Sequence, residues 1–211
     1  EEIILAEKGR AEVLAAAPSL PITMGGRARY NVANCLAAAG ALWSLGLTKE
    51  EIAGGLQSFR AIEDNPGRTN FYDLGDFQVL LDYGHNFAGF QSVLDLLDSL
   101  GPRRKVGVIG MPGDRADRDI LQSGRLCGAR FDRLYVKEDK DRRGRKPGEV
   151  ADLLVQGAKS GGNPWYKIIL DEVKALQQAI DDRLPGDIIA VFYEEYGPLT
   201  EYIKTFAQQE N

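Results

Sequence analysis

The chain has 211 residues, of which 44% are hydrophobic and 27% are charged, a composition typical of globular proteins rather than disordered or collagen-like ones. Its 31 acidic and 26 basic residues give a formal net charge of −5, which argues against general nucleic-acid binding. No apolar run approaches the roughly 18 residues of a membrane span, and two cysteines and one histidine are too few for a Cys/His zinc cage. We therefore expect a cytoplasmic protein that binds neither nucleic acid nor membrane and holds no metal of its own.

The first sixty residues predict a small and mainly helical unit. The expected elements are a strand at residues 2–5 and helices at residues 31–45 and 48–59. Thr48 and Glu51 have the spacing of a capping box, in which each side chain accepts a hydrogen bond from the other residue's backbone N–H. One strand and two helices are too few for an independent core, so we expect residues 1–60 to be the tail of an upstream domain. The chain also begins with Glu1 rather than Met, which indicates a piece of a longer protein.

Residues 61–67 are rich in Asp, Asn, Pro and Gly and predict a linker to a second unit. From residue 66 to residue 211, short apolar strands alternate with amphipathic helices, as in a parallel sheet covered on both faces. Residues 69–75 are compatible with one more strand, including an antiparallel one. The expected strands are 77–82, 105–110, 132–137, 166–170 and 187–193, and the expected helices are 86–99, 117–129, 147–158, 171–182 and 199–207. We therefore predict an α/β fold whose residues 66–211 form a Rossmann-like, doubly wound and mostly parallel sheet.

Ligands of open α/β sheets bind beyond the carboxyl ends of the strands. Asp82 ends one predicted strand, and His85, the only histidine, follows at the start of a helix. An acid and a histidine in this place suit sugar hydroxyls and phosphate oxygens. The alternative is that Asp82 is an ordinary loop acid and that His85 or Asn86 only caps the helix. Arg68, beside the linker, is placed to reach a ligand between the two units, and its alternative is a surface arginine in a turn.

Two charged segments follow the next strands. Asp114 and Arg115 lie in a Gly-Asp-Arg turn, where the fork of the arginine suits a carboxylate or a phosphate. Residues 138–146 mix both signs of charge, so they suit either a cationic side chain held by acids or an anion held by arginines. The candidates there are Glu138, Asp139, Asp141 and Arg142. The alternative for both segments is a solvated turn or loop.

Asn31 and Asn34 lie three residues apart on one face of the alanine-rich helix. An asparagine side chain offers a donor and an acceptor, which suits the edge of an adenine, while the alternative for Asn31 is a helix N-cap. The sequence contains no G-x-x-x-x-G-K-[ST] phosphate loop, no G-x-G-x-x-G fingerprint and no G-x-S-x-G nucleophile elbow.

Five segments, taken in order, resemble the C-terminal part of the Mur ligase superfamily. They are residues 25–34 (GGRARYNVAN), 66–68 (PGR), 81–86 (LDYGHN), 113–120 (GDRADRDI) and 136–145 (VKEDKDRRGR). The last two are most similar to the cyanophycin synthetase branch of that superfamily. The sequence departs from the family pattern at Phe87, where proline is usual, and at residues 192–198.

The resemblance implies part of an ATP-dependent amide ligase, in which ATP with Mg²⁺ converts a carboxylate into an acyl phosphate that an amine then attacks. In the cyanophycin branch it implies that arginine is added to the aspartate side chains of a poly-aspartate chain. Residues 1–60 would end a central ATPase domain, and residues 66–211 would be the Mur ligase C-terminal domain that closes over the nucleotide.

Carried over residue by residue, the resemblance gives each candidate a role. Asn34, with Asn31 nearby, would face the adenine. Arg68 and Asp82 would hold the ribose and phosphates, and His85 would act near the γ-phosphate or the acyl phosphate. The incoming amino acid would be bound by Asp114, Arg115, Glu138, Asp139, Asp141 and Arg142.

The missing phosphate loop leaves the triphosphate and its Mg²⁺ without a cradle, so we expect the 211-residue chain alone to be inactive. An alternative is a stand-alone Rossmann-like module that binds a nucleotide, an amino acid or a partner protein without catalysis. A third interpretation keeps the ligase class but replaces the substrate by a peptidoglycan precursor or a folate.

Overall fold

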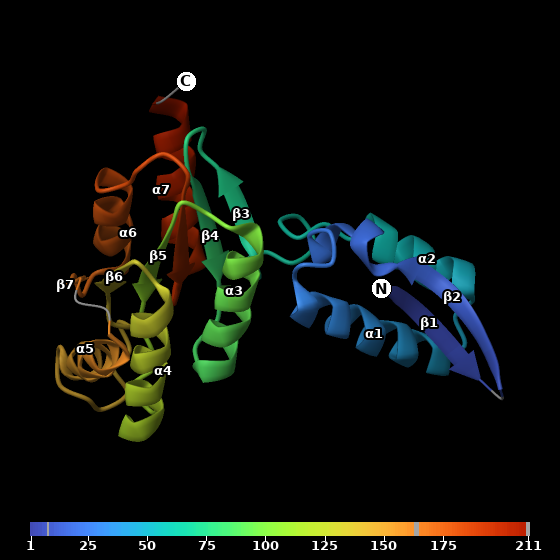
Figure 1. Ribbon diagram of the computed structural model, residues 1–211, viewed down its shortest axis with the longest axis horizontal. Coiled ribbons are helices and arrows are strands. Elements are labelled where there is room, and N and C mark those ends of the chain that lie inside the picture. The colour runs from blue at the N-terminus through green and yellow to red at the C-terminus, as the bar shows by residue number, and fades with distance from the viewer. Residues whose placement is uncertain (8, 163–164, 210–211) are drawn as a thin grey trace. The chain divides into compact units, whose positions relative to one another are not determined.

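The computed structural model describes residues 1–7, 9–162 and 165–209 (Figure 1). The chain divides into two compact units, Glu1–Pro66 and Gly67–Asn211. Both cysteines, Cys35 and Cys127, are buried free thiols. None of the helices in the described ranges has the length and hydrophobicity needed to cross a bilayer.

The N-terminal unit consists of a hairpin and two α-helices. Its elements are the antiparallel strands β1 (Glu2–Glu7) and β2 (Arg10–Ala16), two 3-10 turns (Ala17–Ser19 and Pro21–Thr23), and helices α1 (Arg29–Ser44) and α2 (Lys49–Ser58). Strand β2 was not predicted from the sequence, because charged residues interrupt its apolar pattern and only Leu14 and Ala15 are buried. The capping box of α2 is confirmed: Thr48 Oγ1 accepts the N–H of Glu51 at 3.3 Å, and the Glu51 carboxylate accepts the N–H of Thr48 at 2.8 Å.

A cluster of buried side chains lies inside this N-terminal unit. Ile3 from β1 and Leu14 from β2 belong to the same cluster as Cys35 of α1 and Ile52 of α2. The second strand therefore supplies the packing partner that a single strand and two helices would lack. That residues 1–60 end an ATPase domain stays a prediction.

The C-terminal unit contains a six-stranded sheet in the order β3-β4-β8-β5-β6-β7, and the predicted strands and helices are confirmed. Strand β3 is antiparallel to β4, and the remaining neighbours are parallel. Its elements are β3 (Asn70–Asp73), β4 (Gln78–Asp82), α3 (Phe87–Leu100), β5 (Arg104–Ile109), α4 (Asp117–Arg130), β6 (Arg133–Val136), α5 (Glu149–Gly161), β7 (Tyr166–Ile168), α6 (Glu172–Asp181), β8 (Asp187–Phe192) and α7 (Tyr196–Gln209).

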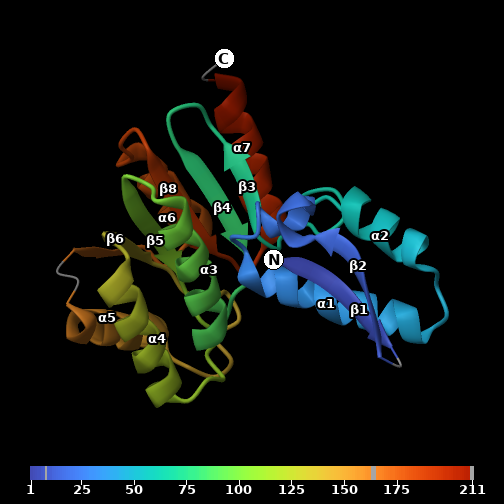
Figure 2. The ribbon, with the colours of Figure 1, turned by 45° about the vertical axis from the view of Figure 1, so that its right-hand side comes forward.

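Helices cover both faces of this sheet, as the two views of Figures 1 and 2 show. On one face, Phe90 of α3 and Leu154 of α5 pack with Leu80 and the other side chains that point to that side. On the other face, Leu176 of α6 and Ile203 of α7 belong to a second cluster. Alternate residues of β3, β4, β5, β6 and β8 thus enter opposite clusters, which confirms the doubly wound prediction.

Local signals set several of the helix ends. Asn86 Oδ1 accepts the N–H of Gly89 at 2.8 Å and caps α3, as the alternative for this residue predicted. Asp171 Oδ1 accepts the N–H of Lys174 at 2.9 Å and caps α6. The expected helix at 147–158 begins later, at Glu149, because Gly148 has a left-handed backbone with φ +83°.

Helices α4 and α5 approach each other on glycines. A Cβ atom at Gly128 of α4 would lie 2.2 Å from the carbonyl oxygen of Ala158 in α5, and one at Gly157 of α5 would lie 2.3 Å from the carbonyl oxygen of Leu121 in α4. Gly124 and Gly161 meet backbone of the facing helix in the same way. Side chains at these positions would have to push the two helices apart.

Candidate functional site

The sequence-predicted residues of the C-terminal unit lie beyond the carboxyl ends of its parallel strands. Asp82 ends β4, the 113–115 turn follows β5, and residues 138–145 follow β6. Because β8 lies between β4 and β5, the residues after β8 lie among these loops. Two groups of side chains result, one around Asp82 and one around the 113–115 turn.

Asp82 is buried, and its carboxylate holds the backbone just before β3. Its Oδ2 accepts the N–H of Thr69 at 2.9 Å and the Thr69 hydroxyl at 3.1 Å, while its Oδ1 accepts the N–H of Gly84 at 2.8 Å. Thr69 has φ +54°, a left-handed conformation that is rare for a β-branched residue. The hydrogen bonds from Asp82 therefore hold in place an unfavourable turn immediately after Arg68.

The surroundings of Asp82 disfavour the charged form of its carboxyl group. Burial raises the pKa of Asp82, and the hydrogen bonds from Thr69 and Gly84 and the nearby charge of Arg68 only partly offset this effect. A carboxylate has about four acceptor positions, and three are used here. Within the described residues, these hydrogen bonds leave one acceptor position of Asp82 unused.

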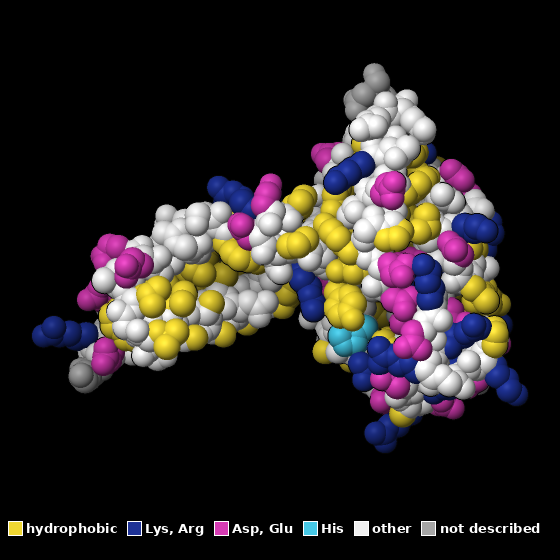
Figure 3. Space-filling view, turned by 180° about the vertical axis from the view of Figure 1, so that it is seen from behind, with side chains coloured by type: hydrophobic (Ala, Val, Ile, Leu, Met, Phe, Trp, Pro, Cys, Tyr) yellow, Lys and Arg dark blue, Asp and Glu magenta, His cyan; other side chains and the backbone are white. Residues whose placement is uncertain are grey.

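Arg68, Tyr83 and His85 form a stack at the surface of this unit. The Arg68 guanidinium carbon lies 4.9 Å from the centre of the Tyr83 ring, and the rings of Tyr83 and His85 are 5.1 Å apart. His85 Nδ1 lies 3.0 Å from the carbonyl oxygen of Tyr83 and donates to it, so the other ring nitrogen is available to a ligand. Figure 3 shows the histidine, in cyan, exposed beside dark blue and magenta side chains.

The segment that carries Arg68 is tied to the sheet at its first residue. The carbonyl oxygen of Gly67 accepts the N–H of Tyr83 at 3.1 Å and the Tyr193 hydroxyl at 3.0 Å. The Asn70 side chain accepts the N–H of Gly67 and the Tyr196 hydroxyl. The backbone on the N-terminal side of Arg68 is therefore fixed to the C-terminal unit.

The second group joins the 113–115 turn to the loop after β6. Arg145 is largely buried, and it donates to the carbonyl oxygens of Gly113 and Arg115, both at 2.7 Å. A Cβ at Gly113 would lie 2.1 Å from the carbonyl oxygen of Arg142, so the two segments are in direct backbone contact. The structure thus brings these two sequence-predicted segments together.

Two acidic residues of the loop, Glu138 and Asp139, have their carboxylates bound to other groups of the protein. The Glu138 carboxylate accepts the N–H of Gly148 at 2.9 Å and that of Val150 at 3.3 Å, and so caps α5 from a distance. Asp139 pairs at 2.7 Å with Lys137, which is buried. A direct contact of either acid with a substrate stays a prediction, and the internal partners favour a supporting role.

The exposed part of the loop has a different pattern. Arg143 pairs with Asp114, which lowers the pKa of that carboxyl, and also lies 3.8 Å from Asp141. Arg115 lies 4.0 Å from Asp114, and its buried Nε has no hydrogen-bond partner within the described residues. Arg142 is half-buried, and across the described ranges no hydrogen bond or ion pair engages its guanidinium. In this second group, Arg142 and Arg115 thus keep guanidinium donors that have no partner among the described residues.

In the N-terminal unit, Asn31 and Asn34 lie together on α1. Asn31 is buried in the first turn rather than at the N-cap, and its Nδ2 donates to the carbonyl oxygen of Ile22 at 3.0 Å. The exposed Asn34 donates to Asn31 Oδ1 at 3.2 Å, which leaves Asn34 Oδ1 free to accept. Asn34 also lines a mainly apolar pocket of about 430 Å³ between α1 and α2, whose other walls include Ala38, Leu56 and Phe59.

Within the residues that the structure describes, no group of three or more His, Cys, Asp or Glu side chains could hold a metal ion. Sequence reasoning placed Arg145 in the charged loop without a role of its own and did not single out Lys137 or Tyr193, although all three hold parts of the site together. Lys137 gave one signal, a lysine directly after the apolar residues of β6. The roles of Arg145 and Tyr193 depend on contacts with residues far away in the sequence, so no local sequence pattern predicts them.

Comparison with known proteins places these features in a family. The family model for the Mur ligase glutamate ligase domain matches residues 67–192. Among curated proteins, cyanophycin synthetase of Synechocystis sp. is 42% identical over 187 residues, which cover 88% of this chain and 21% of that protein. The UDP-N-acetylmuramoyl-L-alanyl-D-glutamate–2,6-diaminopimelate ligase of Gloeobacter violaceus is 30% identical over 77% of this chain and 32% of its own length. The chain thus spans about a fifth of the length of the cyanophycin synthetases that it matches.

Solved structures share the fold at low sequence identity. A structure of MurF from Acinetobacter baumannii matches 98% of this chain and 42% of its own with a TM-score of 0.64 at 19% identity. E. coli FolC in complex with DHPP and ADP matches 84% of this chain and 39% of its own with a TM-score of 0.62 at 20% identity.

Proposed function

Because this chain belongs to the Mur ligase family through its glutamate ligase domain, we propose that it is the C-terminal part of an ATP-dependent amide ligase. The proposed reaction has two steps. A substrate carboxylate oxygen attacks the γ-phosphorus of ATP, which gives an acyl phosphate and ADP. The amine of an amino acid then attacks the acyl carbon, and inorganic phosphate leaves as the amide forms.

Arginine is the proposed amino acid, and a poly-aspartate chain is the proposed acceptor. The support is the 42% identity to a cyanophycin synthetase over most of this chain, together with the mixed charge of residues 138–146. A location in the cytoplasm stays a prediction. The ATPase step needs a phosphate loop and Mg²⁺, which we propose are supplied by an upstream domain of the same protein.

Nucleotide contacts are proposed for both units. Asn34 Oδ1 is free to accept from the amino group of an adenine, and the apolar pocket beside it suits a flat ring. In the C-terminal unit, Arg68 supplies positive charge for phosphates, and Asp82 keeps one acceptor position for a ribose hydroxyl. His85 with Nδ1 fixed as a donor presents its other nitrogen either as an acceptor for an amine proton or, when charged, as a donor to phosphate.

Arg142 carries the proposal for the amino-acid site. It is half-buried in a loop held by its neighbours, and within the described residues its guanidinium has no partner. A guanidinium of this kind suits the α-carboxylate of an incoming amino acid, which it can bind with two parallel hydrogen bonds. Binding the carboxylate would leave the α-amine free to attack.

The test is the steady-state kinetics of the full-length enzyme with ATP, L-arginine and a poly-aspartate peptide. We expect Arg142→Ala to raise the KM for arginine by at least about tenfold, the value of a hydrogen bond to a charged group, with the KM for ATP unchanged. The matched control is Arg118→Ala, because that arginine is 88% exposed at the start of α4 and, among the residues that the structure describes, its one ion pair is with its neighbour Asp119. Equal arginine KM values for the two variants would contradict the proposed site.

The stand-alone binding module predicts a different result. Under that hypothesis the 211-residue chain binds ATP or L-arginine in isothermal titration, and no ADP forms with any upstream domain present. Production of ADP by the full-length enzyme only when both arginine and acceptor are present would exclude it.

A further inference from the structure

A buried lysine connects the loops at the carboxyl end of the sheet. Lys137 follows β6, and its side chain is only 1% exposed. Its Nζ lies 2.7 Å from Asp139 Oδ1 and 2.7 Å from Glu172 Oε2. Burial alone would lower the pKa of Lys137, but these two carboxylates outweigh burial and raise it, so the lysine is charged.

The path of this side chain is set by a glycine. A Cβ at Gly110, just after β5, would lie 2.5 Å from Cε and 2.7 Å from Cδ of Lys137. The stem of Lys137 therefore occupies the space in which a side chain at residue 110 would stand. The backbone of Lys137 is fixed as well, since its N–H donates to the carbonyl oxygen of Ile109 at 2.9 Å.

Glu172 connects Lys137 to the turn after β8. Besides pairing with Lys137, its carboxylate accepts the N–H of Glu194 at 2.7 Å and that of Glu195 at 3.0 Å. The Glu194 carboxylate in turn accepts the N–H of Lys140 at 2.6 Å and that of Asp141 at 3.4 Å. The Lys137 ammonium thus holds the loop after β6 at Asp139 directly, and at Lys140 and Asp141 through two glutamates.

We propose that Lys137 is a positioning residue that fixes the loop of residues 138–146 and thereby aims Arg142 at the amino-acid substrate. This inference rests on the proposed function for its substrate, but the tether itself is a property of the fold. Arg142 directly follows the two residues whose N–H groups Glu194 holds. Because Lys137 is buried and the side chains of Asp139 and Glu172 are only 13% and 10% exposed, these charged contacts hold the loop in place before the substrate arrives.

The experiment compares three variants of the full-length enzyme. Lys137→Met removes the charge and keeps most of the stem. Lys137→Met with Asp139→Asn and Glu172→Gln also removes the stranded carboxylates, so that folding is preserved if the single variant unfolds. Lys105→Met is the matched control, because Lys105 also pairs with a carboxylate, Asp98 at 2.5 Å, but at the start of β5.

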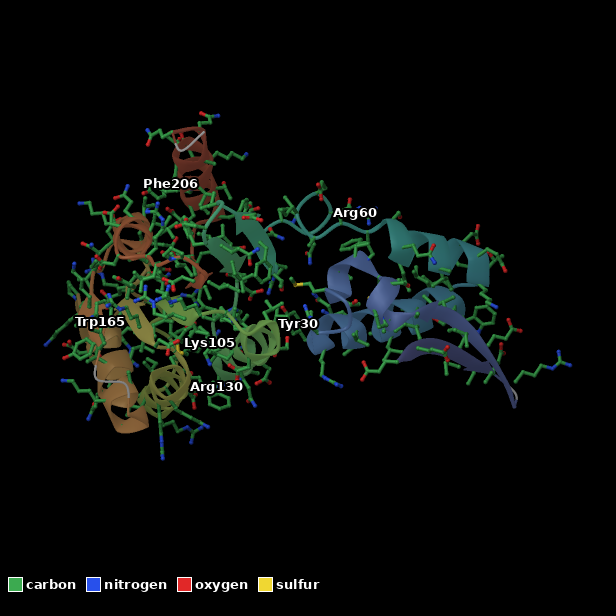
Figure 4. The ribbon with its side chains drawn as sticks, turned by 45° about the horizontal axis from the view of Figure 1, so that its top comes forward. Tyr30, Arg60, Lys105, Arg130, Trp165 and Phe206 are labelled. Atoms are coloured by element: carbon green, nitrogen blue, oxygen red, sulfur yellow. The ribbon has the colours of Figure 1, made fainter. Side chains whose placement is uncertain are left out.

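Figure 4 labels this control lysine together with Arg130, the other partner of Asp98. Hydrogen exchange is measured by mass spectrometry on peptides that cover residues 138–146 and 193–196, and KM is measured separately for ATP and L-arginine. We expect faster exchange in both peptides of the folded Lys137 variants. We also expect the KM for arginine to rise about ten- to a hundredfold with the KM for ATP unchanged, because the loop is displaced. The control should change neither.

The two readouts separate the inference from the proposed function. Faster exchange in an enzyme that does not use arginine would support the tether and reject the proposed substrate. Unchanged exchange in a folded Lys137 variant would overturn the inference, whatever the kinetics show. An equal rise of both KM values would also overturn it, because a general loss of structure rather than loop position would then be the cause.

Discussion

Replacing Gly67 by alanine should disturb both the stability of the C-terminal unit and the placement of Arg68. Gly67 has φ +83°, and a Cβ there would lie 1.9 Å from the hydroxyl oxygen of Tyr193 and 2.9 Å from its Cζ. The same hydroxyl donates to the Gly67 carbonyl oxygen at 3.0 Å. The methyl group would therefore force the tyrosine away and break this hydrogen bond.

The expected loss in the free energy of unfolding has two contributions. An alanine in the left-handed region costs about 1–2 kcal/mol, and a lost hydrogen bond costs about 1 kcal/mol. Gly67→Ala should thus lower the free energy of unfolding by about 2–3 kcal/mol. Tyr193→Phe alone should cost about 1 kcal/mol, since Gly67 keeps its bond from the N–H of Tyr83. The double variant should cost about 1 kcal/mol less than the sum, because both changes remove the same hydrogen bond.

The assay is urea unfolding of the 211-residue chain, followed by tryptophan fluorescence. A Trp43→Phe background leaves Trp165 as the only tryptophan. Trp165 reports on the C-terminal unit because the centre of its ring lies 5.2 Å from the centre of the Tyr135 ring. Linear extrapolation gives the unfolding free energies of the four members of the cycle. A loss below about 0.5 kcal/mol for Gly67→Ala, or strict additivity of the two changes, would refute the reasoning.

Results are also expected for four further variants. Gly128→Ala should destabilise the protein by about 1–3 kcal/mol, because its methyl would meet the backbone of Ala158. By contrast, Gly40→Ala, with open space around it in α1, should stabilise by up to about 1 kcal/mol. Thermal unfolding of both variants checks the pair, and a Gly128 variant as stable as the Gly40 variant would refute it. Thr48→Ala should cost about 1 kcal/mol by loss of the capping box, seen as a lower urea midpoint for the N-terminal unit. Burial tends to raise the pKa of Asp98, but hydrogen bonds from its lysine and arginine partners hold it below the ordinary 3.8, so its contribution is present above that pH and is lost as pH falls. Urea unfolding between pH 7 and pH 3 should therefore show a shallower acid loss for Asp98→Asn, and parallel curves would count against the ion pair.

The repeating pattern of the sheet could be read from the sequence because each strand is a short apolar run with a helix after it. Val79 and Leu81 pack in one cluster while Leu80 packs in the other. A strand that is buried on both faces therefore appears in the sequence as an unbroken run of apolar residues. Strand β2 could not be found in this way, since it lies in a two-stranded hairpin and buries few side chains.

The candidate site was predictable only as a set of positions. The rule that ligands bind beyond strand ends selected Asp82, His85 and the charged loop without indicating which side chains are free. Glu138 has its carboxylate at the start of α5, and Arg145 reaches back to the 113–115 turn. These contacts join residues 10 to 32 positions apart, so only the folded chain reveals that Arg142 is left for a ligand.

The glycine contact between α4 and α5 also bears on the two loops that precede these helices. Helix α4 starts just after the 113–115 turn and α5 starts just after the charged loop, so the distance between these helices sets the distance between the two loops. Four glycines, Gly124, Gly128, Gly157 and Gly161, allow the backbones of the two helices to touch. Larger residues at these four positions would push the two helices apart, and the 113–115 turn would then have to move relative to the charged loop.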